Sequence, residues 1–338
     1  MSVKEFLYTI CPVGNASYIA ANKGFLQNGF EKLGVKPVKL QTLPETEWHV
    51  HYDYASPVLF REGGNVPPIW SKSEGREPVL IGLAVLAQKQ YIFVRADSGI
   101  DAIEQLRKRK IGIPTHPNAV IDFQKAYTEH GFKIALSARG VSVKETEVVD
   151  LHDDDDYLSR SEGKKKTAVE VEALDSGKVD AIYARSTRSQ QLLETGKYKA
   201  IFEIHKHPDL LAPISNTQPN ILTVSRRLAE DSPEIVVEYV KQVILAAQWA
   251  KTNYAEVVNL FAEQTFGTPG QVASGHLLGF HKILTPNLSE EGLALLEGQK
   301  RFLFDHGYIK KDFPLEKWAD DRFLKAAWKE IEKESGEK

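Results

Sequence analysis

Short apolar segments alternate with helical periodicities through the first two thirds of the chain, and helical patterns dominate the last third. Residues 5–10 alternate in apolar character, as expected for a half-buried strand. Continuous apolar runs such as residues 79–83 predict buried strands. In all, strands are predicted at residues 5–10, 38–40, 79–83, 91–94, 110–113, 147–151, 179–183 and 220–224.

Residues that begin and end helices flank the helical patterns. Asn15 is placed to cap a helix that ends near Gly24, and Ser232 with Pro233 begins a strongly periodic helix. Further helices are predicted at residues 103–106, 169–174, 254–265, 269–281, 288–306 and 315–334, and residues 118–123 are predicted to open another. Strands that alternate with helices at this spacing favour a mainly parallel sheet, with ligands at the carboxyl ends of the strands.

Three segments resemble the branch of the type II periplasmic-binding-protein fold that binds sulfonates, nitrate and thiamine precursors. They are residues 91–101, 173–181 and 220–227. The resemblance implies an α/β protein of two lobes, each a mainly parallel sheet flanked by helices, with a helical C-terminal region. Lobe one is expected at residues 1–94 plus 216–338, and lobe two at residues 95–215. A chain of 338 residues is also too long for one comfortable hydrophobic core.

Composition narrows the possible partners. The net charge of −3 and the absence of a concentrated basic face argue against nucleic acid. No apolar run approaches the roughly 20 residues of a membrane span. The first ten residues lack the charged and apolar regions of a signal peptide, so we expect a cytoplasmic protein. A single cysteine fits a reducing compartment or a reactive thiol.

That cysteine, Cys11, stands where a strand ends and a helix begins. The backbone N–H groups and the positive end of a helix dipole lower a thiol pKa there and favour an anionic ligand. A free cysteine is otherwise a small buried hydrophobic residue, and position alone leaves both interpretations open.

Motifs at both ends of the chain resemble the family of bacterial 2′-hydroxybiphenyl-2-sulfinate desulfinases. They are Cys-Pro-Val-x-Asn from residue 11, Gly-Phe-Leu from residue 24, His-x-His-Tyr-Asp from residue 49, Arg-x-Gly-Gly-x-x-Pro-Pro from residue 61 and Leu-Glu-Lys-Trp-Ala from residue 315. The resemblance implies an enzyme without a cofactor that cleaves the carbon–sulfur bond of an aryl sulfinate and releases sulfite.

In that family an essential cysteine acts beside a histidine, an arginine and a glycine amide. By motif these become Cys11, His49, Arg61 and Gly64, with Gly63 beside them. The resemblance favours His49 over His51, because the family's histidine also stands three residues before the Tyr-Asp pair. We interpret this segment as a half-buried strand, on which His49 and His51 would face the same side.

These residue types suit sulfinate chemistry. A guanidinium can donate two parallel hydrogen bonds to a small anion, and glycine allows a close backbone amide. The cysteine either attacks sulfur or protonates the ring carbon that bears it, and the sequence leaves both routes open.

The aryl half of such a substrate needs an apolar wall. The candidates are Tyr18, Trp48, Trp70 and Tyr183, although aromatic side chains more often belong to the core. The desulfinases carry tryptophans soon after the tyrosine that corresponds to Tyr183, whereas this chain continues with Ala-Arg-Ser-Thr-Arg. The identity of the aryl group is therefore open.

Two other functions fit the fold. The runner-up is a non-catalytic solute-binding protein for sulfonates or related anions. The third, an enzyme of thiamine-pyrimidine synthesis, needs a cysteine-rich metal motif that one cysteine cannot supply. The acidic run at residues 153–156 is interpreted as a solvated loop, and no metal site is expected. We expect a monomer.

Overall fold

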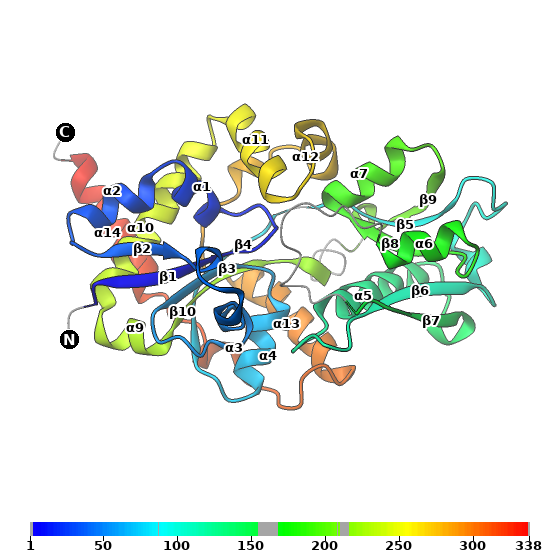
Figure 1. Cartoon of the computed structure of the whole chain (residues 1–338), viewed down its shortest axis with the longest axis horizontal. Coiled ribbons are helices and arrows are strands. Elements are labelled where there is room, and N and C mark those ends of the chain that lie inside the picture. Colours follow the sequence, from blue (N-terminus) through cyan, green and yellow to red (C-terminus); the bar gives the residue numbers. More distant parts are fainter. Residues whose placement is uncertain (1–2, 87, 155–167, 208, 210–215, 337–338) are drawn as a thin grey trace. The chain divides into compact units, whose positions relative to one another are not determined.

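The computed structural model of the protein describes residues 3–86, 88–154, 168–207, 209 and 216–336. It divides into two compact units (Figure 1). Unit 1 comprises Met1–Leu86, Gln218–Phe266 and Leu278–Lys338, and unit 2 comprises Ala87–Thr217 and Gly267–Leu277. Each unit combines strands with helices, so the predicted α/β class is confirmed.

Unit 1 is built on a five-stranded sheet with the order β2-β1-β3-β10-β4. Its strands are β1 (Glu5–Ile10), β2 (Lys36–Lys39), β3 (Leu59–Gly63), β4 (Pro78–Ala84) and β10 (Asn220–Ser225). β1 runs parallel to both β2 and β3, whereas β10 runs antiparallel to β3 and β4. The antiparallel pairing arises because the chain enters β10 from unit 2 and not through a crossover helix within this sheet.

Helices cover both faces of this sheet (Figure 1). The helices of unit 1 are α1 (Ala16–Asn22), α2 (Phe25–Glu31), α3 (Val50–Asp53), α4 (Val66–Ser73), α9 (Arg226–Asp231), α10 (Pro233–Ala250), α11 (Tyr254–Gln264), α13 (Glu290–Asp305) and α14 (Arg322–Gly336). α10 packs against α1, α2 and α14. The predicted start of α10 at Pro233 is confirmed, as is the cap of α1, where Asn15 accepts from the Tyr18 amide at 2.8 Å.

An aromatic cluster joins β1 and β3 to α10. Phe60 stacks on Tyr239 with ring centroids 3.9 Å apart, and Phe6 meets Phe30, Phe60 and Tyr239 edge to face. These rings are fully buried. On the opposite face of the sheet, Leu59 packs with Val50 of α3. The two faces of β1 and β3 therefore have different neighbours, which decides the surroundings of every side chain on these strands.

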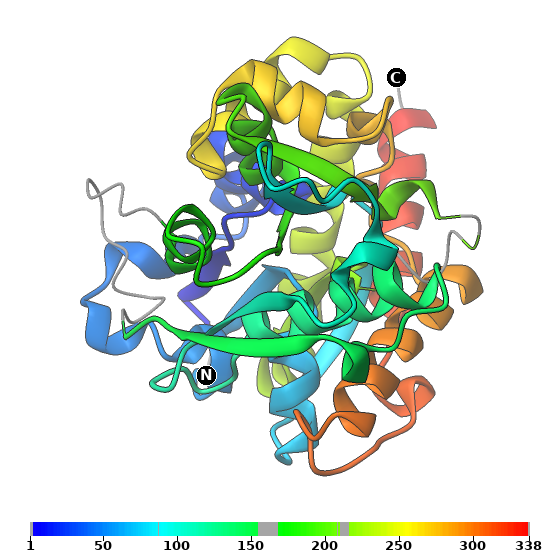
Figure 2. The same cartoon turned by 90° about the vertical axis from the view of Figure 1, so that its right-hand side faces the viewer.

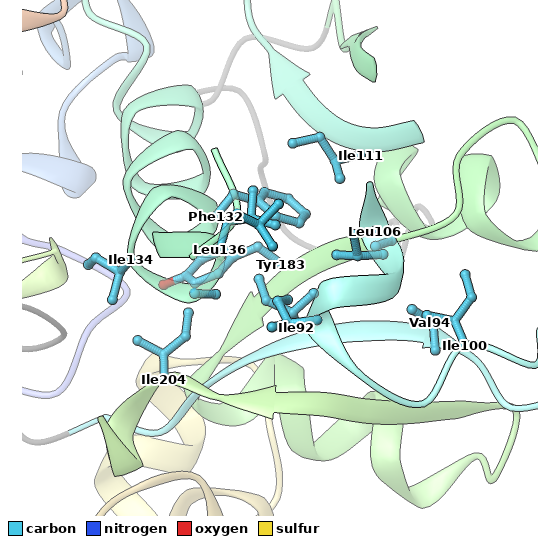
Figure 3. Packing of buried hydrophobic residues seen from close by; sticks show 14 of the residues in the cluster. Ile92, Val94, Ile100, Leu106, Ile111, Phe132, Ile134, Leu136, Tyr183 and Ile204 are labelled. Carbon is cyan, nitrogen blue, oxygen red and sulfur yellow. The ribbon is translucent and has the colours of Figure 1, made fainter. Parts of the chain in front are cut away.

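Unit 2 contains two smaller sheets (Figures 1 and 2). β5 (Gln90–Arg95) lies between β8 (Ile182–Arg185) and β9 (Tyr198–Glu203) and is antiparallel to both, and β6 (Lys110–Thr115) pairs in parallel with β7 (Glu147–His152). Its helices are α5 (Phe123–Ser137), α6 (Val169–Asp175), α7 (Ser186–Glu194) and α12 (Pro269–Gly275). Figure 3 shows a core of this unit, in which Phe132 and Leu136 of α5 pack against Ile92 of β5 and Tyr183 of β8.

The unit boundaries differ in detail from those expected from the sequence. Residues 91–94 were expected in lobe one, but β5 lies in unit 2 because both of its edges pair with strands of that unit. Gly267–Leu277 also belongs to unit 2, where α12 packs against α7. The helix predicted to open with residues 118–123 begins at Phe123, because Asp122 caps it by accepting from the Lys125 amide.

Candidate active site

Two adjacent strands of unit 1 carry the residues around Cys11. The parallel register of β1 and β3 pairs Thr9 with Arg61. Because side chains alternate between the faces of a strand, both lie on the face covered by α3, and Phe60 lies on the face covered by α10. Cys11 follows β1 two residues after Thr9, so its thiol lies on the α3 side as well.

The Cys11 thiol is buried, with 4% of the residue exposed. His51 Nε2 lies 3.5 Å from Sγ, and the Gly64 amide donates a hydrogen bond to the sulfur. Burial raises the pKa of the thiol, the positive charge of Arg61 and the Gly64 bond lower this pKa, and the negative charge of Glu62 raises it. Burial is the largest of these effects and favours the neutral thiol.

Gly63 is required by the closeness of the thiol to β3. A Cβ atom built on Gly63 would overlap Cys11 Sγ and would lie 2.6 Å from Cys11 Cβ. The sulfur therefore rests directly on the backbone of β3, in hydrogen-bonding reach of the next amide, that of Gly64. The structure thus gives a steric reason for glycine at position 63, and at position 64 it places a backbone amide that donates to the sulfur.

Arg61 places a buried positive charge beside the thiol, with 2% of the residue exposed. Nη1 donates to the Gly64 carbonyl oxygen at 2.9 Å, and the guanidinium also hydrogen-bonds the Tyr54 hydroxyl. Burial and the charge of Arg61 hold the pKa of His51 well below its usual range, so this imidazole is neutral. A cation, a neutral imidazole and a neutral thiol together suit an anionic ligand.

The loop from Cys11 to α1 is fixed by side chains from distant parts of unit 1. Gln264 Nε2 donates to the carbonyl oxygens of Cys11 and Val13 at 2.7 and 2.6 Å. Asn220 Nδ2 donates to the Gly14 carbonyl oxygen at 3.0 Å. These amides hold the carbonyl groups of the loop and leave the thiol facing β3 and α3. The sequence alone did not predict Gln264 or Asn220, because 200 or more residues separate each from this loop.

The structure places His51 beside the thiol, and the preference for His49 is corrected. His49 has a side chain that is 51% exposed, and its Nδ1 lies 2.9 Å from Asp53 Oδ2. The interpretation of this segment as a strand was wrong. His49 and α3 have a helical backbone, so the side chains of His49 and His51 are about 200° apart around the helix axis and lie on nearly opposite sides. Pro44 followed by Glu45 and Glu47 is a helix-start signal that could have indicated this.

Replacing the two histidines separately tests this correction. We expect His51→Gln to lower the rate of sulfite release from an aryl sulfinate about 10²-fold, because it removes the imidazole that contacts Sγ. His49→Gln should keep the wild-type rate within about twofold, since it loses only the contact of an exposed side chain with Asp53. Steady-state kinetics of both variants measure this, and equal losses in the two variants would contradict it.

No protein-family model matches the sequence. The chain is 27% identical to the 2′-hydroxybiphenyl-2-sulfinate desulfinases of Rhodococcus erythropolis and Rhodococcus qingshengii, over 94% of this chain and 92% of each relative. The predicted resemblance to the desulfinases is therefore confirmed over almost the whole chain.

Solved structures show the same relationship. A cysteine-to-serine variant of DSZB in complex with biphenyl-2-sulfinic acid matches with a TM-score of 0.80 and 25% identity, over 97% of this chain and all of that one. The sulfonate-binding protein SsuA from Methylobacillus flagellatus KT matches with a TM-score of 0.73 and 14% identity, over 98% of this chain and 95% of that one. The chain has the type II periplasmic-binding-protein fold. The SsuA match establishes the fold alone.

Within this type II fold, the four aromatic candidates are not equivalent. Tyr18 is in α1 and largely buried, and Trp70 is half-buried in α4. Trp48 packs against the cluster that contains Leu59, and its Nε1 donates to the Leu43 carbonyl oxygen at 3.0 Å. These three belong to unit 1, as Cys11 does.

Tyr183 belongs instead to the core of unit 2 (Figure 3). Its hydroxyl donates to Gln90 Oε1 at 2.8 Å and accepts from Asn216 Nδ2 at 3.2 Å. Burial is the main reason why the pKa of this phenol lies above its usual value. Its ring leaves no room for a Cβ on Gly131, which would lie 2.5 Å from the ring. These contacts support a packing role.

We expect Tyr183→Phe to destabilise the protein by about 1 kcal/mol, because it removes the hydroxyl that both donates and accepts in a buried polar network. Kinetics should stay within about twofold of wild type. Thermal unfolding and a sulfite assay on the same preparation measure the two effects. A large rise in KM with unchanged stability would show instead that the phenol binds substrate.

No group of three or more histidine, cysteine or carboxylate side chains that could hold a metal ion occurs among the described residues. Asp155 and Asp156 of the acidic run lie outside the described residues. No helix in the described part of the chain is long and apolar enough to cross a membrane.

Proposed function

We propose that this protein is an aryl-sulfinate desulfinase that converts 2′-hydroxybiphenyl-2-sulfinate and water to 2-hydroxybiphenyl and sulfite, with Cys11 as the reacting group. The net reaction is a hydrolysis of a carbon–sulfur bond. The protein is proposed to act as a cytoplasmic monomer without a cofactor.

One observation carries this proposal. The only cysteine of the chain is buried in contact with an imidazole nitrogen and a backbone amide, and the charge of the buried Arg61 guanidinium acts on it. A cysteine that served only as a small apolar core residue would not require three polar neighbours. The desulfinase that was crystallised with biphenyl-2-sulfinic acid carried serine in place of a cysteine, which supports a functional role for the thiol in such proteins.

The surroundings of Cys11 favour the route in which the cysteine acts as an acid. Burial keeps the thiol neutral, so it has a proton to donate. The thiol protonates the ring carbon that bears sulfur, the carbon–sulfur bond breaks, and its electron pair stays with the ring as SO₂ departs. Water converts SO₂ to bisulfite and supplies the proton that restores the thiol. Arg61, the Gly64 amide and His51 stabilise the transient thiolate.

The test is a direct assay. The purified protein is incubated with 2′-hydroxybiphenyl-2-sulfinate, and sulfite and 2-hydroxybiphenyl are measured together over time. Equal amounts of both products, formed over many turnovers, are expected. An alkanesulfonate serves as a control that should bind weakly and release no sulfite. A folded protein that yields neither product from any aryl sulfinate contradicts the proposal.

The competing function is reversible binding of sulfonates or related anions, which the same fold performs in proteins such as SsuA. It predicts tight binding of an anion with no change in that anion over hours. Calorimetry with the sulfinate, combined with product analysis of the same solution, separates the two functions.

A further inference from the structure

A chain of three side chains leads from Gln41, which is partly exposed, to the thiol. Gln41 Nε2 donates to Thr9 Oγ1 at 3.1 Å, Thr9 Oγ1 lies 2.6 Å from His51 Nδ1, and His51 Nε2 lies 3.5 Å from Cys11 Sγ. Thr9 and His51 are both buried. The proposed chemistry involves only the last of these contacts, so the function of the first two is open.

The direction of the hydrogen bonds follows from the donors available. The Nε2 end of the Gln41 side chain carries only donors, so Thr9 Oγ1 accepts that bond. The single proton of the Thr9 hydroxyl is then available for Nδ1 of a neutral imidazole. If Nδ1 accepts, the one ring proton of His51 must be on Nε2, the nitrogen that faces Sγ.

We propose that Thr9 is a positioning residue that selects one tautomer of His51: its hydroxyl donates to Nδ1, so that Nε2–H points at the Cys11 sulfur. In this tautomer His51 donates a hydrogen bond to the thiolate and does not remove the proton of the thiol. The other charged groups that act on Cys11 are Arg61 and Glu62 of β3. Nδ1 itself has the Thr9 hydroxyl as its hydrogen-bond partner at 2.6 Å, so we infer that the tautomer depends on Thr9.

Nitrogen-15 NMR of histidine side chains tests this without any substrate. The His51 signals are identified by their loss in His51→Gln. We expect wild-type Nε2 to show the shift of a protonated nitrogen and Nδ1 that of an unprotonated one. The opposite assignment would overturn the proposal.

Two variants extend the test. In Gln41→Glu the new carboxylate accepts a hydrogen bond from the Thr9 hydroxyl, so Thr9 Oγ1 must accept from Nδ1–H and the tautomer should invert. Gln41→Met, which also removes the amide donor but adds no acceptor, is the matched control and should keep the wild-type tautomer. An unchanged tautomer in Gln41→Glu would contradict the role of Thr9.

Thiol reactivity gives a second readout. Loss of one donor to the thiolate in Thr9→Val should raise the midpoint of the pH profile of Cys11 alkylation by about one pH unit, equivalent to about a tenfold slower reaction at a fixed pH below it. Thr9→Ser keeps the hydroxyl and should restore the wild-type profile. A Thr9→Val protein that is less stable but has an unchanged tautomer and profile would show a merely structural role.

Only the effect of Thr9 on the rate of sulfite release rests on the proposed function. Tautomer and alkylation are measured on the free protein. A failure of the sulfite assay therefore leaves the tautomer test intact, and an inverted wild-type tautomer would refute the role of Thr9 even if sulfite is released.

Discussion

Cys11→Ser is expected to lower the rate of sulfite release about a thousandfold or more while the protein stays folded. A serine hydroxyl is a far weaker acid than a thiol and a weaker nucleophile, so it fails in either route to carbon–sulfur cleavage. Serine has nearly the same shape as cysteine, and the Gly64 amide that donates to Sγ can donate to Oγ. The anion-binding groups Arg61 and Gly64 remain, so the sulfinate should still bind.

Kinetics and binding of the same variant check this prediction. Stopped sulfite assays measure kcat, and calorimetry with the sulfinate measures the dissociation constant. A Kd within about tenfold of the wild-type KM, together with the lost rate, would assign the thiol to the chemical step. Sulfite release at the wild-type rate from Cys11→Ser would refute the assignment of Cys11.

Gly63→Ala should lower kcat about 10²-fold by displacing the sulfur. The added methyl group would overlap Sγ, and neither the strand backbone nor the loop held by Gln264 can easily give way. A displacement of about 1 Å in a reacting group can cost 10²-fold in rate. Overpacking should also cost about 1–3 kcal/mol of stability. The measurements are kcat and thermal unfolding.

The matched control for this variant is Gly270→Ala. At Gly270 a Cβ would approach only Thr268 Oγ1, at 3.9 Å, so the same chemical change has room. This variant should keep the wild-type kcat. A normal kcat in Gly63→Ala would mean that the thiol can act from a position away from β3, and the proposed contact with the Gly64 amide would then have to be abandoned.

Local signals predicted the position of Cys11 well. The alternation of residues 5–10 and the cap at Asn15 place the cysteine between a strand and a helix, and the structure confirms both elements. The motif around Arg61 also directed attention to Gly63, where the structure leaves no room for a Cβ beside the Cys11 sulfur.

The side-chain directions in the segment before β3 could not be predicted from the alternation. Residues 48–52 contain polar and apolar residues in a pattern that fits both a short strand and a single helical turn. A strand turns His49 and His51 to one side, whereas the helix turns them apart and leaves only His51 at the thiol. The place of Tyr183 in the core of unit 2 could not be predicted either. It depends on contacts with Gln90 and Asn216, two residues that are distant from Tyr183 in the sequence.

The aromatic cluster around Phe6 has a consequence for the opposite face of the sheet. Phe6 is held among Phe30, Phe60 and Tyr239, far along β1 from the thiol, and it fixes which residues of β1 point to α10. A slip of one residue in β1 would turn Thr9 and Cys11 away from Arg61. The aromatic cluster therefore fixes the register of β1 that places Thr9 and Cys11 beside Arg61. Substitutions that loosen this aromatic packing would allow some molecules to fold with β1 in a shifted register. The fraction of active molecules would then fall before the protein unfolded.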